Sequence, residues 1–236
     1  MAERLLEGRV ALVTGASRGI GAAVAKLFAS HGAHIVAVAR TVGALEELDD
    51  AIAEAGGTAT LVPQDLADLD SIDRLGAALH ERFGKLDILV ANAGVLGVLS
   101  PIAHVDPKVW DETMLVNLTV NFRLIRSMDP LLRLSDAGRA IFVTSGASLK
   151  PRAYWGPYGT SKAALDYMVG TWAQEVAKTG IRVNLVNPGA TRTGMRAAAM
   201  PGEDPMTLPA PEDIAPAFLD LAIPACTRHG ETVNAQ

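Results

Sequence analysis

The chain has 236 residues, of which 49% are apolar and 20% charged, and its formal net charge is −5. This length and apolar content predict one domain with a sizeable core. No run of Lys and Arg is long enough to follow a phosphate backbone, which excludes nucleic acid as an expected partner. A small-molecule partner is favoured instead.

Cys226 is the only cysteine, which excludes an intrachain disulfide and a cysteine-rich metal site and fits a reducing compartment. The sequence predicts no metal site. The first residues, Met1–Arg9, mix acidic and basic side chains, and the apolar run Val10–Val13 is far too short for a signal sequence or a membrane span. We therefore expect a cytoplasmic protein with no membrane partner.

From Gly8 onward, short apolar runs alternate with longer segments of helical period. The apolar runs are continuous, as in strands that helices cover on both faces. The sequence therefore predicts a single doubly wound, Rossmann-type α/β domain over residues 1–236, with a mainly parallel sheet in the order 3-2-1-4-5-6-7 and helices on both faces. The seven predicted strands are Val10–Thr14, Ile35–Ala39, Thr58–Val62, Ile88–Ala91, Ala140–Thr144, Val183–Asn187 and Glu231–Val233.

One irregular region, residues 190–212, is rich in Gly and Pro and contains Met195, Met200 and Met206. Flexible Met side chains adapt to varied apolar surfaces, so this region is predicted to form a mobile lid over a ligand. The alternative is an ordinary surface excursion.

A glycine-rich segment, Thr14–Gly21, follows the first predicted strand directly and opens the first predicted helix. Glycines in this position let the chain turn sharply and let a phosphate approach the helix N-terminus. The spacing differs from G-x-G-x-x-G, and a tight turn without a ligand is the alternative. The candidate cofactor-binding residues of this turn are Gly15, Ser17, Arg18, Gly19, Ile20 and Gly21.

The end of the second predicted strand indicates which nucleotide is bound. Many NAD sites carry an acidic residue there for the ribose 2′-hydroxyl, whereas this strand ends in Ala39-Arg40-Thr41. Arg40, together with Arg18 from the glycine turn, is suited to bidentate capture of a 2′-phosphate. NADP(H) is therefore predicted over NAD(H), although either arginine alone could be solvated surface.

Four features in order along the chain together resemble the short-chain dehydrogenase/reductase family. They are the glycine turn, Asp65 after the third strand, Asn92-Ala93-Gly94 after the fourth, and Tyr158-Gly159-Thr160-Ser161-Lys162. The resemblance runs from about Gly8 to Val233. It implies that Asp65 meets the adenine amino group with Leu66 beside the ring, and that Asn92, Ala93 and Gly94 steady the strands beside the ribose. A turn carboxylate is the alternative for Asp65.

The same resemblance assigns Pro188-Gly189-Ala190-Thr191-Arg192-Thr193 to the segment after the sixth strand. It implies that Pro188, Gly189 and Thr191 lie at the nicotinamide carboxamide, and that Thr193 faces the carboxamide or a phosphate. A plain Pro-Gly turn is the alternative.

Carbonyl reduction needs a proton donor at the oxygen and a second hydrogen bond to hold it, and Tyr158 and Ser145 can supply these. A phenol of pKa about 10 stays protonated at neutral pH, and a nearby cation lowers that pKa. Lys162 lies one helical turn from Tyr158, so its charge is expected to lower the pKa of the phenol. Ser148 is the reserve for Ser145.

Asn117 resembles the family's helix asparagine, which interrupts the helix and holds a water that links the lysine to solvent. Asn121, one turn later, fits that pattern less well, and a polar helix-surface residue is the alternative for Asn117. For the substrate, Trp155 and Met195 are the pocket candidates, with Ser145 at the reacting oxygen.

The leading functional hypothesis is hydride transfer between NADP(H) and a carbonyl or secondary alcohol. One alternative is a reductase of 3-oxoacyl groups on an acidic carrier protein, for which Arg152, Arg192 and Arg196 would form the basic patch. A second alternative is a catalytically silent nucleotide-binding regulatory protein. The resemblance also implies a homodimer or homotetramer built on the long helices that begin near Asp106 and Gly156.

Overall fold

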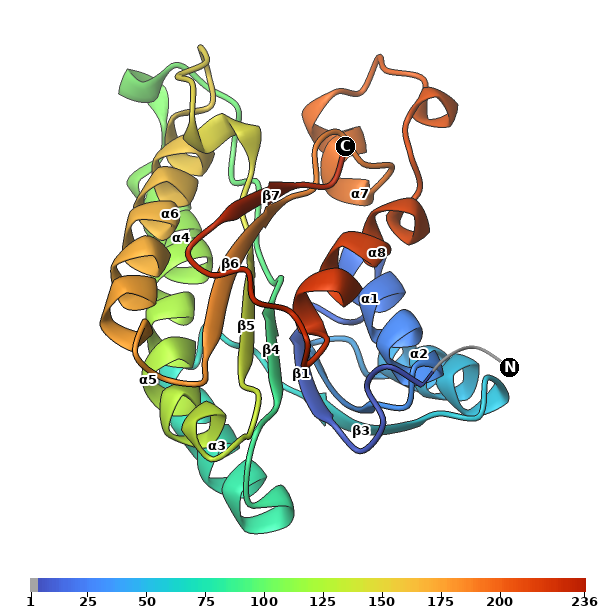
Figure 1. Ribbon diagram of the computed structural model, residues 1–236. Coiled ribbons are helices and arrows are strands. Elements are labelled where there is room, and N and C mark those ends of the chain that lie inside the picture. Colours follow the sequence, from blue (N-terminus) through green and yellow to red (C-terminus); the bar gives the residue numbers. More distant parts are fainter. Residues whose placement is uncertain (1–3) are drawn as a thin grey trace.

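The central strands are buried along their whole length, and this is what their continuous apolar runs predict. The computed structural model describes residues 4–236 and shows one sheet between two helical layers (Figure 1). The sheet order is β3-β2-β1-β4-β5-β6-β7, and all six strand pairings are parallel. The predicted Rossmann-type α/β fold is confirmed. The strands are β1 (Val10–Thr14), β2 (His34–Ala39), β3 (Thr58–Pro63), β4 (Ile88–Ala91), β5 (Arg139–Val143), β6 (Arg182–Asn187) and β7 (Thr232–Asn234).

Alternate residues of each strand enter different cores, because successive side chains of a strand point to opposite faces. In β1, Ala11 and Val13 pack into the core under α1, α2 and α8, and Leu12 packs into the core under α3, α5 and α6. Figure 1 shows these two helical layers on either side of the sheet. The helices are α1 (Gly19–Ser30), α2 (Val42–Glu54), α3 (Leu69–Phe83), α4 (Pro107–Met114), α5 (Val120–Arg133), α6 (Gly156–Val176), α7 (Gly194–Ala199) and α8 (Pro211–Ala222).

The predicted strand ends lie within a residue of the observed ones. For example, β5 ends at Val143 rather than Thr144, although the N–H of Thr144 still donates to Val186 at 2.9 Å. Short 3₁₀ turns occur at Ile102–His104, Gly146–Ser148 and Pro205–Thr207.

The long helix predicted from Asp106 is interrupted. Asp106 caps its N-terminus by accepting a hydrogen bond from Lys108 N at 2.8 Å. Between α4 and α5 the chain forms a π-helical turn, Leu115–Thr119, that contains Asn117. Single π turns within α-helices are frequent at functional sites.

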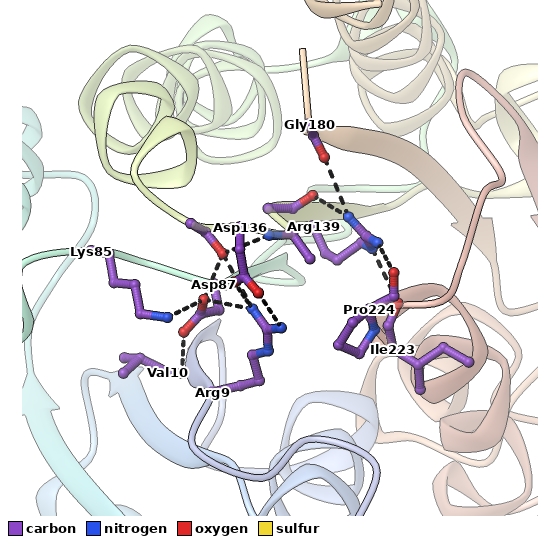
Figure 2. A network of polar contacts seen from close by, with 12 residues as sticks. Arg9, Val10, Lys85, Asp87, Asp136, Arg139, Gly180, Ile223 and Pro224 are labelled. Atoms are coloured by element: carbon purple, nitrogen blue, oxygen red, sulfur yellow. Dashed lines mark hydrogen bonds and ion pairs between the residues drawn. The ribbon is translucent and has the colours of Figure 1, made fainter.

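At the amino ends of β1, β4 and β5, a buried carboxylate joins several elements (Figure 2). The side chain of Asp87 is fully buried and accepts hydrogen bonds from Arg9 at 3.0 Å, Lys85 at 2.9 Å, Ser135 at 2.5 Å and Val10 N at 3.0 Å. Burial alone would raise the pKa of Asp87, and the hydrogen bonds from Ser135, Lys85 and Val10 reverse this, so that the pKa lies below its usual value.

Arg139, in the same view, is a buried arginine that forms no ion pair with a carboxylate within residues 4–236 (Figure 2). Its guanidinium donates to the carbonyl oxygens of Ile223 at 3.2 Å, Pro224 at 2.5 Å and Cys226 at 3.2 Å. These carbonyls belong to the segment that follows α8, so Arg139 fixes that segment to the start of β5. Desolvation lowers the pKa of Arg139.

We predict that Asp87→Asn lowers the free energy of unfolding by about 2–4 kcal/mol, since it leaves buried donors without a charged acceptor. The pKa of Asp87 is lowered in the folded protein, so this loss is complete above about pH 4 and shrinks as the pH falls through that lowered pKa. Urea unfolding at pH 7 and pH 3 measures both effects. Asp136→Asn, which removes the exposed partner of Arg9, is the control and should leave the free energy of unfolding close to that of the wild type.

Candidate active site

A cleft of about 760 Å³ lies at the carboxyl ends of the central strands, where ligands gather in open α/β sheets. The structure brings nearly all the predicted site residues into its lining. Two predicted residues, Gly21 and Asn117, are absent from the lining and lie buried behind it. The predicted residues in the lining are Gly15, Ser17, Arg18, Gly19, Ile20, Arg40, Asp65, Leu66, Asn92, Ala93, Gly94, Ser145, Trp155, Tyr158, Lys162, Pro188, Gly189, Thr191, Thr193 and Met195.

The glycine turn between β1 and α1 depends on two close approaches. Gly15 has a φ of +65°, and a Cβ there would lie 3.0 Å from the Cα of Ala93. A Cβ at Gly21 would lie 2.3 Å from the carbonyl oxygen of Gly15. Gly21 therefore lets the first turn of α1 pack against the glycine turn, and it does not itself line the cleft. The N–H groups at the start of α1 can receive a phosphate.

Four hydrogen bonds, which the sequence did not predict, join the ends of β1 and β4. The Thr14 hydroxyl accepts from Asn92 N at 3.0 Å and from Ala93 N at 3.1 Å. In return, Asn92 Nδ2 donates to the carbonyl oxygens of Thr14 at 2.9 Å and Gly15 at 3.2 Å. The sequence feature that could have indicated these bonds is a threonine at the end of a buried strand.

Two arginines occupy one end of the cleft, and neither forms an ion pair within residues 4–236. Arg18 and Arg40 are both exposed and both line the cleft. No carboxylate follows β2 directly, so the cationic groups are not neutralised there. Asp65 is also exposed and lines the cleft. Its Oδ1 accepts from Ala67 N at 3.0 Å, which is the geometry of a turn carboxylate, the alternative role named for this residue.

Tyr158 lies in the first turns of α6, with its side chain buried at the cleft and beside Ser145. Burial raises the pKa of Tyr158, and the hydrogen bond with Ser145 offsets part of the increase. The pKa is therefore higher than that of a free phenol, contrary to the lowering expected from Lys162, because desolvation outweighs the other effects in the protein alone. A phenol held in this way stays protonated and able to donate.

Lys162 is fully enclosed behind Tyr158. Its ammonium donates to the carbonyl oxygen of Val143 at 2.8 Å and lies 5.9 Å from the centroid of the Tyr158 ring. Burial lowers the pKa of Lys162 to about 8, and the negative charge of Asp166 opposes that shift. The ammonium and the side chain of Asn117 both lie close to Gly94, at 3.7 and 3.1 Å from the position of a Cβ there.

Asn117 is saturated by hydrogen bonds within the protein. Its Oδ1 accepts from Val95 N at 2.8 Å, and its Nδ2 donates to Val95 O at 2.9 Å and Ser161 Oγ at 3.0 Å. The side-chain amide therefore joins the π turn to the loop after β4 and to α6. The backbone carbonyl of Asn117 accepts from Asn121 Nδ2 at 2.8 Å.

Trp155 enters the cleft from a strained turn. Among residues 4–236, Tyr154 is the only non-glycine residue with a positive φ, +75°. Its carbonyl accepts from Ser100 N at 3.0 Å, and Trp155 packs edge to face on Tyr158, with ring centroids 5.8 Å apart. The strained backbone of Tyr154 thus sets the direction in which Trp155 lies against the reactive phenol.

The segment over the cleft, residues 190–212, folds as α7 and a 3₁₀ turn. Thr193 caps α7 by accepting from Arg196 N at 3.2 Å, and Met195 lines the cleft. Arg196 forms a bidentate pair with Glu203, with both distances at 2.6 Å. This pair holds the two halves of the segment together.

Asn187, at the end of β6, is a second residue that the sequence analysis missed. Its Oδ1 accepts from Gly146 N at 3.1 Å and from Gly189 N at 3.2 Å. One side chain therefore positions the loops that carry Ser145 and Pro188. The sequence feature that could have indicated this role is an asparagine at the carboxyl end of a buried strand.

No helix in residues 4–236 is long and apolar enough to cross a membrane. Over the same residues, no group of three or more His, Cys, Asp or Glu side chains is placed to hold a metal ion.

Comparison with known proteins agrees with this geometry. The short chain dehydrogenase family profile matches residues 9–204. YciK, an uncharacterized oxidoreductase of Escherichia coli (strain K12), is 39% identical over 223 residues, covering 92% of this chain and 87% of that protein. A short chain dehydrogenase structure from Salmonella enterica superposes with a TM-score of 0.96 at 37% identity, covering 100% of this chain and 99% of that one.

A further structure, from Shigella flexneri and complexed with NADP, has a TM-score of 0.93 at 36% identity and covers 99% of both chains. The fold, the cleft and these matches together define a nucleotide-dependent oxidoreductase fold. This chain belongs to the short-chain dehydrogenase/reductase family and is an oxidoreductase of that family.

We predict a pH-dependent stability difference between the wild type and Lys162→Met. Lys162 titrates near 10.5 in the unfolded chain and at about 8 when folded. Between these values the unfolded chain binds more protons, so wild-type stability rises with pH relative to Lys162→Met. A shift of one pKa unit corresponds to about 1.4 kcal/mol of stability. In a protein of this size, 1 kcal/mol of stability changes the melting temperature by about 2–4 °C. The difference in melting temperature between the wild type and Lys162→Met should therefore change by roughly 5 °C between pH 8 and 10.

The control for this titration is Lys178→Met, whose side chain is exposed. Its melting-temperature difference from the wild type should stay flat over the same pH range. A flat difference for Lys162→Met as well would contradict the lowered pKa of Lys162.

Proposed function

We propose that this protein transfers a hydride between NADP(H) and a carbonyl or secondary alcohol, with Tyr158 as the proton donor and acceptor. The observation that carries the proposal is a protonated, buried phenol held beside Ser145 at the cleft, with the ammonium of Lys162 behind it. The cofactor supplies or accepts the hydride when bound. The protein's own residues handle the oxygen and its proton.

In the direction of reduction, the hydroxyl of Tyr158 gives its proton to the oxygen of the substrate carbonyl as the carbon receives the hydride. The product is a secondary alcohol, and Tyr158 is left as a phenolate. Ser145 donates a second hydrogen bond to the same oxygen and stabilises the developing charge. Protonated Lys162 stabilises the phenolate by its positive charge and lowers the cost of the proton transfer.

NADP(H) is supported over NAD(H) by the arginines at one end of the cleft. Arg18 and Arg40 form no ion pair within the described residues, and the end of β2 offers no carboxylate to a ribose 2′-hydroxyl. Two guanidinium groups suit a dianionic 2′-phosphate. Asp65, Leu66 and the loops at Asn92–Gly94 and Pro188–Thr193 would complete the cofactor site.

The substrate end of the cleft supports a neutral, apolar carbonyl compound over an acidic carrier protein. Its lining is largely apolar: Val95, Leu96, Val116, Trp155 and Met195. Of the three arginines considered for a carrier, Arg196 is neutralised by Glu203, Arg152 lies over the Trp155 ring at 5.9 Å, and Arg192, which lines the cleft, donates to the sulfur of Met206 at 3.2 Å. Faster turnover of a carrier thioester than of small ketones, by orders of magnitude, would reverse this preference.

The segment 190–212 is proposed as the lid over this substrate end. Met195 lines the cleft and Met206 is 74% exposed beside Arg192, so flexible apolar side chains are available to close on a substrate. The homo-oligomer implied by the family resemblance stays a prediction. It is supported by Tyr167, which is 82% exposed on the outer face of α6.

A catalytically silent regulatory protein is the weaker candidate, because Ser145, Tyr158 and Lys162 are all present at one cleft. It would be favoured by tight NADPH binding with no turnover across a broad panel of ketones and aldehydes.

We predict that Tyr158→Phe lowers kcat/KM by a factor of about 10²–10⁴, since it removes the proton donor and little else. The dissociation constant for NADPH should change by less than about threefold, because the ring remains. NADPH oxidation with a panel of ketones measures the first quantity, and fluorescence titration the second. The control is Tyr167→Phe, on the outer face of α6, and a Tyr158→Phe variant as active as this control would overturn the mechanism.

We predict that Arg40→Ala raises the dissociation constant for NADPH by about 10- to 100-fold, since it removes charge-assisted hydrogen bonds to the 2′-phosphate. Binding of NADH should stay within about threefold, because NADH lacks that phosphate. Calorimetric titration with both nucleotides gives the two constants. Arg74→Ala, an exposed arginine of α3, is the control, and a wild type that binds NADH more tightly than NADPH would contradict the assignment.

A further inference from the structure

A chain of buried hydrogen bonds runs from α5 through the π turn to the backbone of Tyr158. Asn121 Nδ2 donates to the carbonyl oxygen of Asn117 at 2.8 Å, and Asn117 Nδ2 donates to Ser161 Oγ at 3.0 Å. Ser161 Oγ donates in turn to the carbonyl oxygen of Tyr158 at 2.8 Å. Asn117 and Ser161 are 0% exposed and Asn121 is 2% exposed, so water does not compete for these bonds.

The first bond of the chain follows from the π turn. A π turn changes the regular helical ladder locally, and at this turn a side chain adds a bond to a backbone carbonyl. Asn121 supplies that bond to Asn117. Because both groups are buried, removing the side-chain donor loses a bond that water does not replace and frees the turn to relax.

The last bond of the chain reaches the helix that carries the reactive groups. Ser161 lies between Tyr158 and Lys162 in sequence, and its hydroxyl binds the carbonyl of Tyr158 three residues earlier. Such side-chain bonds to a helix carbonyl bend the helix locally. The Asn117 amide holds this serine in place and also fixes both backbone groups of Val95, which lines the cleft.

We propose that Asn121 and Ser161 are positioning residues that fix the first turn of α6, and with it the phenol of Tyr158, against the floor of the cleft. The proposal rests on the function proposed above, because it is Tyr158 that these residues position. Neither side chain touches the cleft, so they act only through Asn117 and the α6 backbone.

The test compares Asn121→Val with Asn121→Thr. The two substitutions are nearly isosteric, and only threonine can donate to the carbonyl four residues earlier, as Thr113 and Thr171 do in this protein at 2.7 and 3.0 Å. Thr113→Val is the matched control, since it removes one buried bond of this kind, 0% exposed, outside the chain of bonds. Ser161→Ala breaks the chain at its other end.

The first readout does not depend on turnover. The chain has 3 tyrosines, so ¹³Cζ-tyrosine labelling gives three resonances, and Tyr158→Phe assigns the one from Tyr158. We expect this resonance to shift or broaden in Asn121→Val and Ser161→Ala. It should stay at the wild-type position in Asn121→Thr and Thr113→Val. A wild-type Tyr158 resonance in Asn121→Val would overturn the proposal, as would an equal change in Thr113→Val.

The second readout is kinetic. We expect kcat to fall about tenfold in Asn121→Val and to recover to within about twofold in Asn121→Thr, since small misplacements of a reacting group cost rate. The KM for NADPH should stay within about threefold, because the cofactor contacts remain. If the wild type reduced no carbonyl compound, the proposed function would fail, and the Tyr158 resonance would still decide whether Asn121 positions the phenol.

Discussion

The parallel sheet imposes one constraint on everything else: all its strands end at the same edge, so their last residues and the loops after them must share one space. At that edge the strand ladders stop, and backbone N–H groups need other partners. Thr14 accepts from Asn92 and Ala93, and Asn187 accepts from Gly146 and Gly189. These side chains therefore fix the positions of the loops that line the cleft.

At the opposite edge of the sheet, charged side chains connect the neighbouring elements. There, Asp87 gathers Arg9, Lys85 and Ser135, and Arg139 binds the carbonyls at the end of α8. Buried charges are costly unless they are fully paired, and the partners of Asp87 come from the segments that precede β1, β4 and β5. The amino edge is therefore suited to holding the layers together, while at the carboxyl edge Arg18 and Arg40 form no ion pair with any residue from 4 to 236 and are open to a ligand.

The sequence predicted the strand order, the parallel pairing and the position of the glycine turn, because the alternation of strands with helices and the glycines that end the helices are local signals. Gly21 was assigned to the ligand from its place in the motif, whereas its contact is with the carbonyl of Gly15 across the turn. Thr14, Asn187 and Asn121 were not identified as organisers of the site. Their partners lie on other elements or depend on a π turn, and no spacing rule in one sequence reveals either.

The pKa values of Tyr158 and Lys162 could not be predicted from spacing for the same reason. Spacing placed an ammonium near a phenol and favoured a lowered phenol pKa, but burial acts on both groups and favours the neutral form of each. Burial therefore raises the pKa of Tyr158, which stays protonated near neutral pH, and lowers that of Lys162 to about 8, so the protonation of Lys162 responds to small changes in its surroundings. A ligand that adds negative charge beside Lys162 would favour its protonated form. Filling the cleft would thus strengthen the cation that Tyr158 needs when it gives up its proton.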